Sequence, residues 1–351
     1  MSTEDVWKVG RVINYFGRGL TRDALLHAEK SGRIPPAKRN SDRAASRYWT
    51  IDQIPAIGRE FGFMRSPERP LALTVFSAKG GTYKSTLTLN LGRTYALHGY
   101  KTCLIGLDYQ CDLTLALGLG ETYEEVDTLE ELRNMKSDPG LAEYQERLGT
   151  PQALSLNDLL LDTDIPTLKV IPEEPNLAAL TARLNNTTRR EYFLSDYVIK
   201  ELKNEFDIIL IDCNPSWDIL VSNALAACDV LITPLETSVM QFRNVDGFLQ
   251  MIDGYRHAMN VALPHLFVPT RFNRSRKLAQ QILTYYRTDM PSVGVTQDGL
   301  IRDNVTGEES VANGVSTLEY APKKEAAHDM RNLCTELSEL IADVTKAAAA
   351  A

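Results

Sequence analysis

The sequence predicts an α/β fold with a doubly wound, mostly parallel sheet. From residue 71 onward, short apolar runs with the length of buried strands alternate with segments of helical periodicity. Such alternation is typical of parallel strands joined by crossover helices. A glycine-containing loop follows the first strand, and aspartates end the second and fourth, where sheets of this class gather their sites. The expected strands span 71–77, 102–107, 169–172, 207–213, 230–235 and 265–270.

The loop after the first strand has the residue types of a phosphate-binding loop. Its glycines let successive backbone N–H groups face an anion, and the following helix start adds positive potential. We expect Lys84 to neutralise β- and γ-phosphate charge and the Ser85 hydroxyl to ligate Mg²⁺. The loop is therefore predicted to bind a nucleotide. The residues expected to do so are Lys79, Gly80, Gly81, Thr82, Tyr83, Lys84, Ser85 and Thr86.

This stretch resembles the deviant P-loop of the ParA/MinD family of ATPases, whose pattern is K-G-G-x-x-K-[ST]. The resemblance implies ATP as the nucleotide and a homodimer in which Lys79 of each subunit reaches the phosphates of the other subunit's ATP. The general P-loop pattern has glycines at positions 78 and 83, where this chain has Ala78 and Tyr83. If the backbone at Tyr83 requires a positive φ, the tyrosine costs about 1 to 3 kcal/mol.

The second predicted strand ends in a motif that resembles the family's D-x-D-x-Q-G-N-x-T. Asp108 matches the second aspartate, which in the family positions or activates the attacking water, and we expect it beside the metal. Gly106 replaces the first aspartate, Cys111 the glycine and Asp112 the asparagine. An aspartate that merely caps a turn at the strand end is the alternative.

The fourth predicted strand, Ile208-Ile209-Leu210-Ile211, ends in Asp212, as in a Walker B motif. We expect Asp212 to hold Mg²⁺ directly or through water. Asn214 stands where the family usually has the first proline of D-x-P-P.

Two later segments extend the resemblance to about residue 342. The loop after strand 265–270 lies near the adenine in the family, which makes Thr270, Arg271 and Asn273 candidate base contacts. Residues 299–305 resemble the family's I-R-x-N-V stretch. In partitioning members of the family, arginines in these loops bind DNA nonspecifically. The alternative is that the basic residues here form an ordinary solvent-exposed charged surface with no DNA-binding role. The matching residues are Arg274, Arg276, Lys277 and Arg302.

A basic segment precedes this region. The chain carries a net charge of −8, yet residues 1–65 hold 12 Lys/Arg and 7 Asp/Glu. Helical spacing at 4–16 and 22–30, a proline- and arginine-rich stretch at 34–49 and a helix at 51–61 resemble a MerR-type winged helix-turn-helix. The resemblance implies base or phosphate contacts from Arg22 and backbone contacts from Lys38, Arg39, Arg43 and Arg47.

The alternative for this segment is a helical extension that packs on the ATPase or binds a protein partner. We divide the chain into a DNA- or partner-binding domain (1–65), a linker (66–70), the ATPase domain (71–346) and a tail (347–351).

Composition places the chain among soluble proteins of the reducing cytoplasm. It has 351 residues, of which 44% are hydrophobic and 24% charged. No apolar run has transmembrane length, and the N-terminus lacks a signal-peptide core. The five cysteines show no C-x-x-C spacing, which argues against a disulfide frame or zinc site. We expect a cytoplasmic, nucleoid-associated protein with no membrane contact.

Together these patterns predict a DNA-partitioning or cargo-positioning ATPase. By resemblance, ATP binding drives dimerisation, the dimer binds DNA, and hydrolysis stimulated by DNA and a ParB-like partner releases it. The N-terminal domain would bind operator DNA and repress the protein's own operon. The alternative is a nucleotide-sensing transcriptional regulator with little ATPase activity, which Tyr83, Gly106, Cys111 and Asn214 favour.

Overall fold

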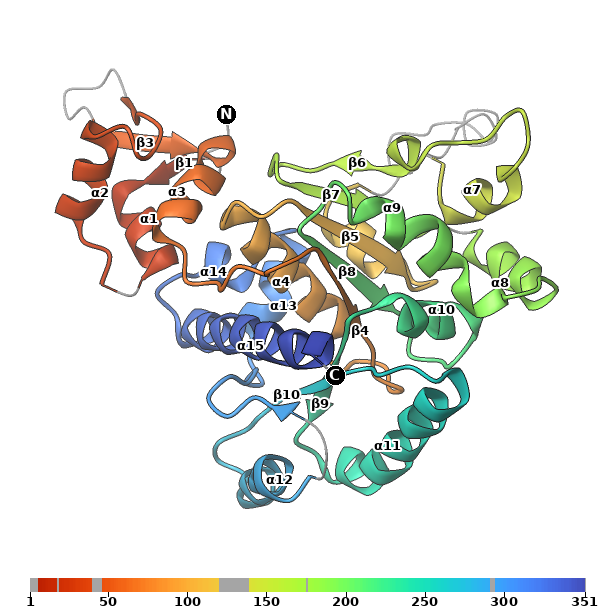
Figure 1. Cartoon of the computed structure of the whole chain (residues 1–351). Coiled ribbons are helices and arrows are strands. Elements are labelled where there is room, and N and C mark those ends of the chain that lie inside the picture. The colour runs from red at the N-terminus through yellow and green to blue at the C-terminus, as the bar shows by residue number, and fades with distance from the viewer. Residues whose placement is uncertain are drawn as a thin grey trace, which may run out of the picture.

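A central eight-stranded sheet organises the chain in the computed structural model, which describes residues 6–17, 19–39, 46–119, 139–174, 176–290 and 294–350. Every neighbouring pair in this sheet is parallel except β6 and β7. The predicted doubly wound, mostly parallel sheet is confirmed (Figure 1). In spatial order its strands are β11 (Gly294–Val295), β10 (His265–Thr270), β9 (Val230–Glu236), β4 (Leu71–Val75), β8 (Ile208–Cys213), β5 (Thr102–Leu107), β7 (Leu168–Ile171) and β6 (Leu161–Asp162).

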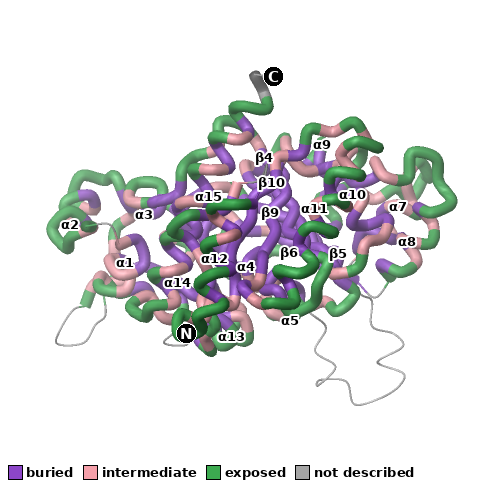
Figure 2. Tube along the Cα trace, turned by 90° about the horizontal axis from the view of Figure 1, so that it is seen from below, coloured by how far each residue is buried: buried purple, intermediate pink, exposed green. Residues whose placement is uncertain are grey.

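Helices cover both faces of this sheet, and alternate strand residues point to opposite faces. Ile208 and Leu210 pack toward α4 (Lys84–Leu97) and α15 (Glu325–Ala350). Ile209 and Ile211 pack on the other side, against α10. Figure 2 shows the buried strands enclosed between exposed helix surfaces. The other helices of this region are α5 (Asp112–Ala116), α7 (Leu141–Arg147), α8 (Leu177–Asn185), α9 (Lys200–Leu202), α10 (Ile219–Ala227), α11 (Val239–Met259), α12 (Lys277–Thr288), α13 (Val305–Ala312) and α14 (Thr317–Tyr320).

The N-terminal unit is a small three-stranded sheet with three helices. Its antiparallel strand order is β1-β3-β2. The prediction of a helix over 4–16 is wrong at its start, because Val6 to Lys8 pair with β3 and the helix begins at Val9. Thr21 caps the second helix, accepting a hydrogen bond from the Ala24 N–H at 3.2 Å. The elements are β1 (Val6–Lys8), α1 (Val9–Phe16), α2 (Arg22–Lys30), β2 (Lys38–Arg39), β3 (Arg47–Thr50) and α3 (Ile54–Phe61).

This unit shares a hydrophobic core with the region predicted to be the ATPase domain. Tyr15 and Phe16 are fully buried in the same cluster as Leu97 of α4. Arg331 of α15 donates to the carbonyl oxygens of Asn14 and Tyr15 at 2.6 and 3.2 Å. The described part of the N-terminal unit is therefore fixed on α4 and α15 by packing as well as by the covalent connection, as Figure 1 shows.

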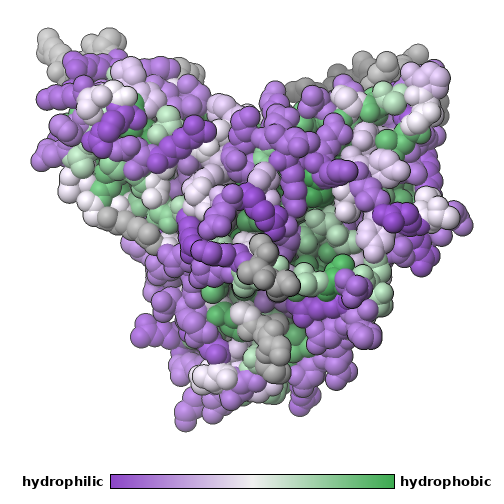
Figure 3. Space-filling model, in the orientation of Figure 1, coloured by the Kyte–Doolittle hydropathy of each residue, from purple (hydrophilic) through white to green (hydrophobic). Residues whose placement is uncertain are grey.

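A groove of about 1370 Å³ separates the N-terminal unit from the β6 end of the sheet. Trp7 and Arg11 line one side, and Asp162 and Asp164 line the other. Figure 3 shows the hollow on a face where hydrophilic residues predominate. Across the described part of the chain, no helix combines the length and apolar character that a bilayer crossing requires.

Candidate nucleotide-binding site

The phosphate-binding loop connects β4 to the first residue of α4. An added Cβ at Gly80 or Gly81 would meet no atom within 4 Å, and Gly81 has a φ of +70° that favours glycine. The buried Lys84 turns back over the loop and donates to the Lys79 carbonyl at 3.3 Å, while the Thr82 hydroxyl donates to the same oxygen at 3.2 Å. The exposed part of the loop thus stands at a helix N-terminus beside a buried cation, which suits a phosphate anion.

Tyr83 occupies the left-handed region, with φ 71° and ψ 26°. The condition for backbone strain at this position is therefore met. The Tyr83 side chain is buried, and the Arg271 guanidinium lies 5.2 Å from its ring centroid. Arg271 also donates to the Gly81 carbonyl at 3.1 Å. Burial raises the pKa of the Tyr83 phenol. The tyrosine thereby joins the loop to the end of β10.

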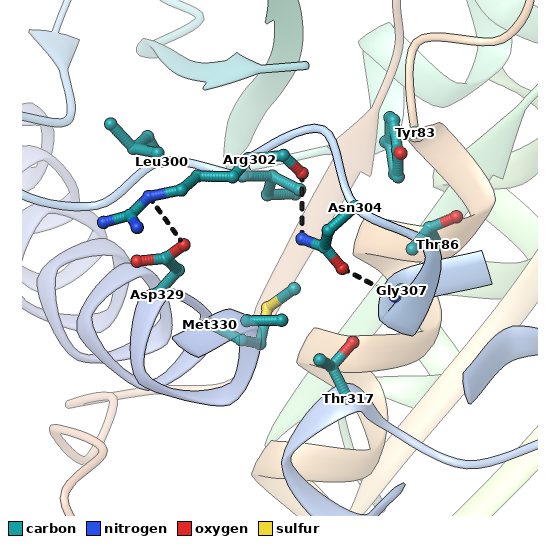
Figure 4. Close-up of a pocket in the computed structure, with 11 residues that line it drawn as sticks. Tyr83, Thr86, Leu300, Arg302, Asn304, Gly307, Thr317, Asp329 and Met330 are labelled. Atoms are coloured by element: carbon teal, nitrogen blue, oxygen red, sulfur yellow. Dashed lines mark hydrogen bonds and ion pairs between the residues drawn. The ribbon is translucent and has the colours of Figure 1, made fainter. Parts of the chain in front are cut away.

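The small pocket behind Tyr83 is not the nucleotide site. Figure 4 shows Tyr83 and Thr86 on one side, with Asn304 and Gly307 on another. Its volume is about 10 Å³, enough for roughly one water molecule. Asn304 caps α13 by accepting from the Gly307 N–H at 3.1 Å.

Ser85 and Asp212 come together beneath the loop. Asp212, the residue before the last of β8, has no exposed surface, and its Oδ1 accepts a hydrogen bond from the Thr88 hydroxyl at 3.2 Å. The nearby Ser85 hydroxyl acts to lower the pKa of the carboxylate. The other oxygen, Oδ2, is buried without a partner among the described residues. Burial, and to a smaller extent the negative charge of the nearby Glu173, raise the pKa of Asp212 to about 7.

These oxygen donors fit Mg²⁺. The cation prefers hard oxygen ligands and is held by one or two protein groups together with phosphate oxygens and water. The orphaned Oδ2 of Asp212 and the adjacent Ser85 hydroxyl meet that requirement. The described residues contain no group of three or more acidic, histidine or cysteine side chains arranged for a metal, so such a site would depend on the nucleotide.

Asp108 follows β5 at the same edge of the sheet. It is buried, and its Oδ1 accepts from the Gln110 N–H at 3.0 Å. Cys111, where the resembling motif has glycine, has a φ of 57°. The structure therefore contains a second left-handed non-glycine residue in a loop of the site.

Lys79 reaches out of the loop and forms an ion pair with Glu236, the last residue of β9. Its side chain keeps 43% of its surface exposed. Asn214 forms a turn after β8, accepting from the Ser216 N–H at 2.8 Å and donating to Asp218 at 3.1 Å. A turn built by an asparagine thus stands where the family usually has proline.

The candidate base contacts differ in their surroundings. Thr270 is fully buried at the end of β10, and its hydroxyl has no partner among the described residues. The Asn273 side-chain oxygen accepts from both the backbone N–H (3.0 Å) and the hydroxyl (2.6 Å) of Ser275. Arg271, between them, is the residue that touches the phosphate-binding loop.

The candidate DNA-binding residues outside the N-terminal unit divide into two groups. Arg274, Arg276 and Lys277 are exposed at the start of α12. Arg302 instead pairs with Asp329 at 3.2 Å and with Glu325, both of α15 (Figure 4 shows the Asp329 pair). Its charge is therefore already balanced.

The candidates in the N-terminal unit also differ. Arg22, at the start of α2, and Arg39 are exposed. Lys38 is exposed and donates to the Thr50 hydroxyl at 3.2 Å. Arg47 forms an ion pair with Glu29 of α2. Arg43 lies outside the described residues.

Sequence reasoning missed Glu173, a buried carboxylate at this site. It lies two residues after β7, and its Oε2 accepts from the Thr114 N–H at 2.8 Å and from the Thr114 hydroxyl. The rule that selects Asp108 and Asp212, a carboxylate near the carboxyl end of a parallel strand, also applies to Glu173. The consecutive acidic residues Glu173 and Glu174, one residue beyond the strand, were the available signal.

The fold and this site define a P-loop nucleotide-binding protein of the α/β class. The chain belongs to the AAA domain family, which matches residues 72–264. It is 27% identical over 270 residues to the chromosome-partitioning ATPase Soj of Treponema pallidum, covering 76% of this chain and 96% of Soj.

Solved structures show the same fold. The apo McdA structure from Cyanothece aligns with a TM-score of 0.64 at 18% identity, covering 77% of this chain and all of McdA. A plasmid partition protein from Borrelia burgdorferi bound to AMPPNP aligns with a TM-score of 0.61 at 20% identity, covering 78% of this chain and all of that chain.

Proposed function

We propose that this protein is a ParA-type ATPase that partitions DNA or positions a cargo. The observation that carries the proposal is the assembly of Lys84, Ser85, Asp108 and Asp212 at one edge of the sheet, around a loop with exposed glycines. The similarity to Soj and to the partition proteins supports the same function.

Each residue has a distinct task in the proposed hydrolysis. The loop amides and Lys84 bind the β- and γ-phosphates of ATP. Mg²⁺, which Ser85 and Asp212 would hold, neutralises phosphate charge. Asp108 accepts a hydrogen bond from the attacking water and orients it in line with the γ-phosphate. The Gln110 N–H holds the Asp108 carboxylate in place for this task.

Dimerisation is proposed to use Lys79. The ion pair with Glu236 holds this lysine within its own subunit, at the exposed surface beside the loop. Triphosphate on a second subunit offers more negative charge than one carboxylate, so Lys79 is expected to exchange Glu236 for the phosphates across the interface.

Sedimentation of the Lys79→Ala and Glu236→Gln variants tests this step. With a slowly hydrolysed ATP analogue, Lys79→Ala should remain monomeric. Glu236→Gln should dimerise at a protein concentration equal to or lower than the one at which the wild type dimerises, because its Lys79 is released from the ion pair. Lys101→Ala, a change at an exposed lysine before β5, is the control and should behave as wild type. Unchanged dimerisation of Lys79→Ala would contradict the proposed dimer interface.

DNA and a ParB-like protein are the proposed partners. Arg274, Arg276 and Lys277 are the exposed cations for nonspecific backbone contacts, whereas the paired Arg302 contributes less. The N-terminal unit, with Arg22 and Arg39 exposed, is proposed as the winged helix-turn-helix that binds operator DNA. Footprints of Arg22→Ala and Arg39→Ala that match wild type would remove that assignment.

A second candidate function is a nucleotide-sensing transcriptional regulator with little turnover. The left-handed Tyr83 and Cys111 favour it, because strain in both loops of the site opposes the tight geometry that hydrolysis needs. Both functions share nucleotide binding, and only a measurement of turnover separates them.

A further inference from the structure

Gly106 leaves an open position on the sheet beside Asp212. The two residues are direct partners in the parallel register of β5 and β8. Leu104, two residues before Gly106, packs on the α4 side of the sheet, as do Leu210 and the Asp212 carboxylate that contacts Thr88. A side chain at position 106 would therefore lie next to Asp212 on the face toward α4.

The Glu173 side chain fills this position. A Cβ added to Gly106 would lie 2.3 Å from both Cγ and Cδ of Glu173 and 2.7 Å from its Oε1. Glycine at 106 and the long acidic side chain at 173 thus fit each other. The carboxylate that an aspartate on β5 would place here comes instead from the second residue after β7.

The two oxygens of Glu173 are used differently. Oε2 is held by the backbone N–H and hydroxyl of Thr114, which orient the carboxylate. Oε1 is buried and has no partner in the described part of the chain. Asp212 Oδ2, on the adjacent strand, is likewise buried without a hydrogen-bond partner among the described residues. Two buried carboxylate oxygens without donors are costly unless water or a cation approaches them.

We propose that Glu173 is a positioning residue of the nucleotide site, whose Oε1 accepts hydrogen bonds from magnesium-bound or attacking water beside Asp212. The inference rests on the proposed nucleotide-binding function. In this assignment the Glu173 carboxylate occupies the space beside Asp212 that a carboxylate side chain at position 106 would otherwise fill. Residues that hydrogen-bond to metal ligands or to metal-bound water change metal affinity by about 10- to 100-fold.

The test measures binding of a fluorescent, slowly hydrolysed ATP analogue as a function of Mg²⁺ concentration. Glu173→Gln keeps the side-chain size but removes the charge. Its half-saturating Mg²⁺ concentration should rise about 10-fold or more, while nucleotide binding without Mg²⁺ stays at the wild-type value. Thr114→Val is the matched control: it removes the hydroxyl that orients Oε2 but keeps the carboxylate, and should shift the Mg²⁺ response less.

Exchanging the two positions makes the test specific. Gly106→Asp alone should disrupt the site, because its Cβ overlaps Glu173. Gly106→Asp combined with Glu173→Ser returns the carboxylate to β5 and should restore most of the Mg²⁺ response.

Three results would overturn the inference. They are an unchanged Mg²⁺ response in Glu173→Gln, an equal shift in Thr114→Val, and a double variant no better than Gly106→Asp. A wild-type chain that binds no nucleotide at all would overturn the proposed function as well, so the two failures are distinguishable.

Discussion

Tyr83 combines an unfavourable backbone with a favourable side chain. The left-handed conformation costs a non-glycine residue about 1 to 2 kcal/mol, but the buried ring packs under Arg271. The balance between the two terms determines how firmly the phosphate-binding loop is held.

Replacing Tyr83 by glycine and by alanine separates these terms. Both variants lose the same ring, but only glycine adopts φ 71° without strain. Tyr83→Gly should therefore be about 1 kcal/mol more stable than Tyr83→Ala, as measured by urea unfolding. At an ordinary φ the order reverses, because alanine restricts the unfolded chain. An alanine variant as stable as the glycine variant would show that the loop is unstrained.

Asp212 makes the stability of the nucleotide-free protein depend on pH. Burial raises its pKa from the ordinary value of 3.8 to about 7, so folding favours the protonated acid. The folded state then binds more protons than the unfolded state across this window, and the free energy of unfolding falls as pH rises from about 4 to 7.

Asp212→Asn should remove that contribution. At pH 8 the variant is expected to be about 2 to 4 kcal/mol more stable than wild type, and at pH 4 the two should agree. Urea unfolding over a pH series measures the difference. Parallel pH profiles for the two proteins would contradict the assigned protonation.

The sequence predicted the positions of the site residues that belong to continuous motifs. Lys84 and Ser85 follow from the loop pattern, and Asp108 and Asp212 from their strand ends. Glu173 could not be predicted in the same way, because its fit to Gly106 depends on β7 lying beside β5. The pairing of Arg302 with α15 likewise depends on tertiary packing.

At the level of elements, long buried strands were predictable and short ones were not. The expected strands agree with β4, β5, β7, β8, β9 and β10 to within about two residues, because each is a continuous apolar run. The two-residue strands β6 and β11 carry no periodic signal. The segment 6–8 has the apolar spacing of a helix, but pairing with β3 makes it a strand.

The contact between α3 and α4 depends on one glycine. A Cβ at Gly58 would lie 2.0 Å from the Leu97 carbonyl oxygen and 2.6 Å from the His98 Cα. Both neighbours are backbone, so the helices must separate to admit a methyl group. The N-terminal unit is thus seated on α4 through direct backbone contact.

Gly58→Ala should lower the free energy of unfolding by about 1 to 3 kcal/mol or more. Gly247→Ala is the matched control, since Gly247 is an exposed helical glycine of α11 with no atom within 4 Å of an added Cβ. That variant should gain about 0.5 to 1 kcal/mol. Chemical unfolding of both proteins checks the pair; equal effects would contradict the close contact.

In the whole molecule, the N-terminal unit and the nucleotide site meet through α4. This helix begins at Lys84 in the site and ends at Leu97 in the core shared with Tyr15 and Phe16. Removing residues 1–65 would therefore expose apolar surface of the ATPase region. Point variants of exposed residues such as Arg22 are the sounder way to test operator binding.

The most direct test of the central claim is an ATPase assay of wild type, Asp108→Ala and Asp112→Ala, with and without nonspecific duplex DNA, over a salt series. Asp112 is exposed at the start of α5 and serves as the control. We predict turnover that DNA stimulates, stimulation that fades with salt, and a loss of about 100-fold or more in Asp108→Ala alone. ATP binding without turnover in wild type, or undiminished turnover in Asp108→Ala, would contradict the proposed hydrolytic cycle.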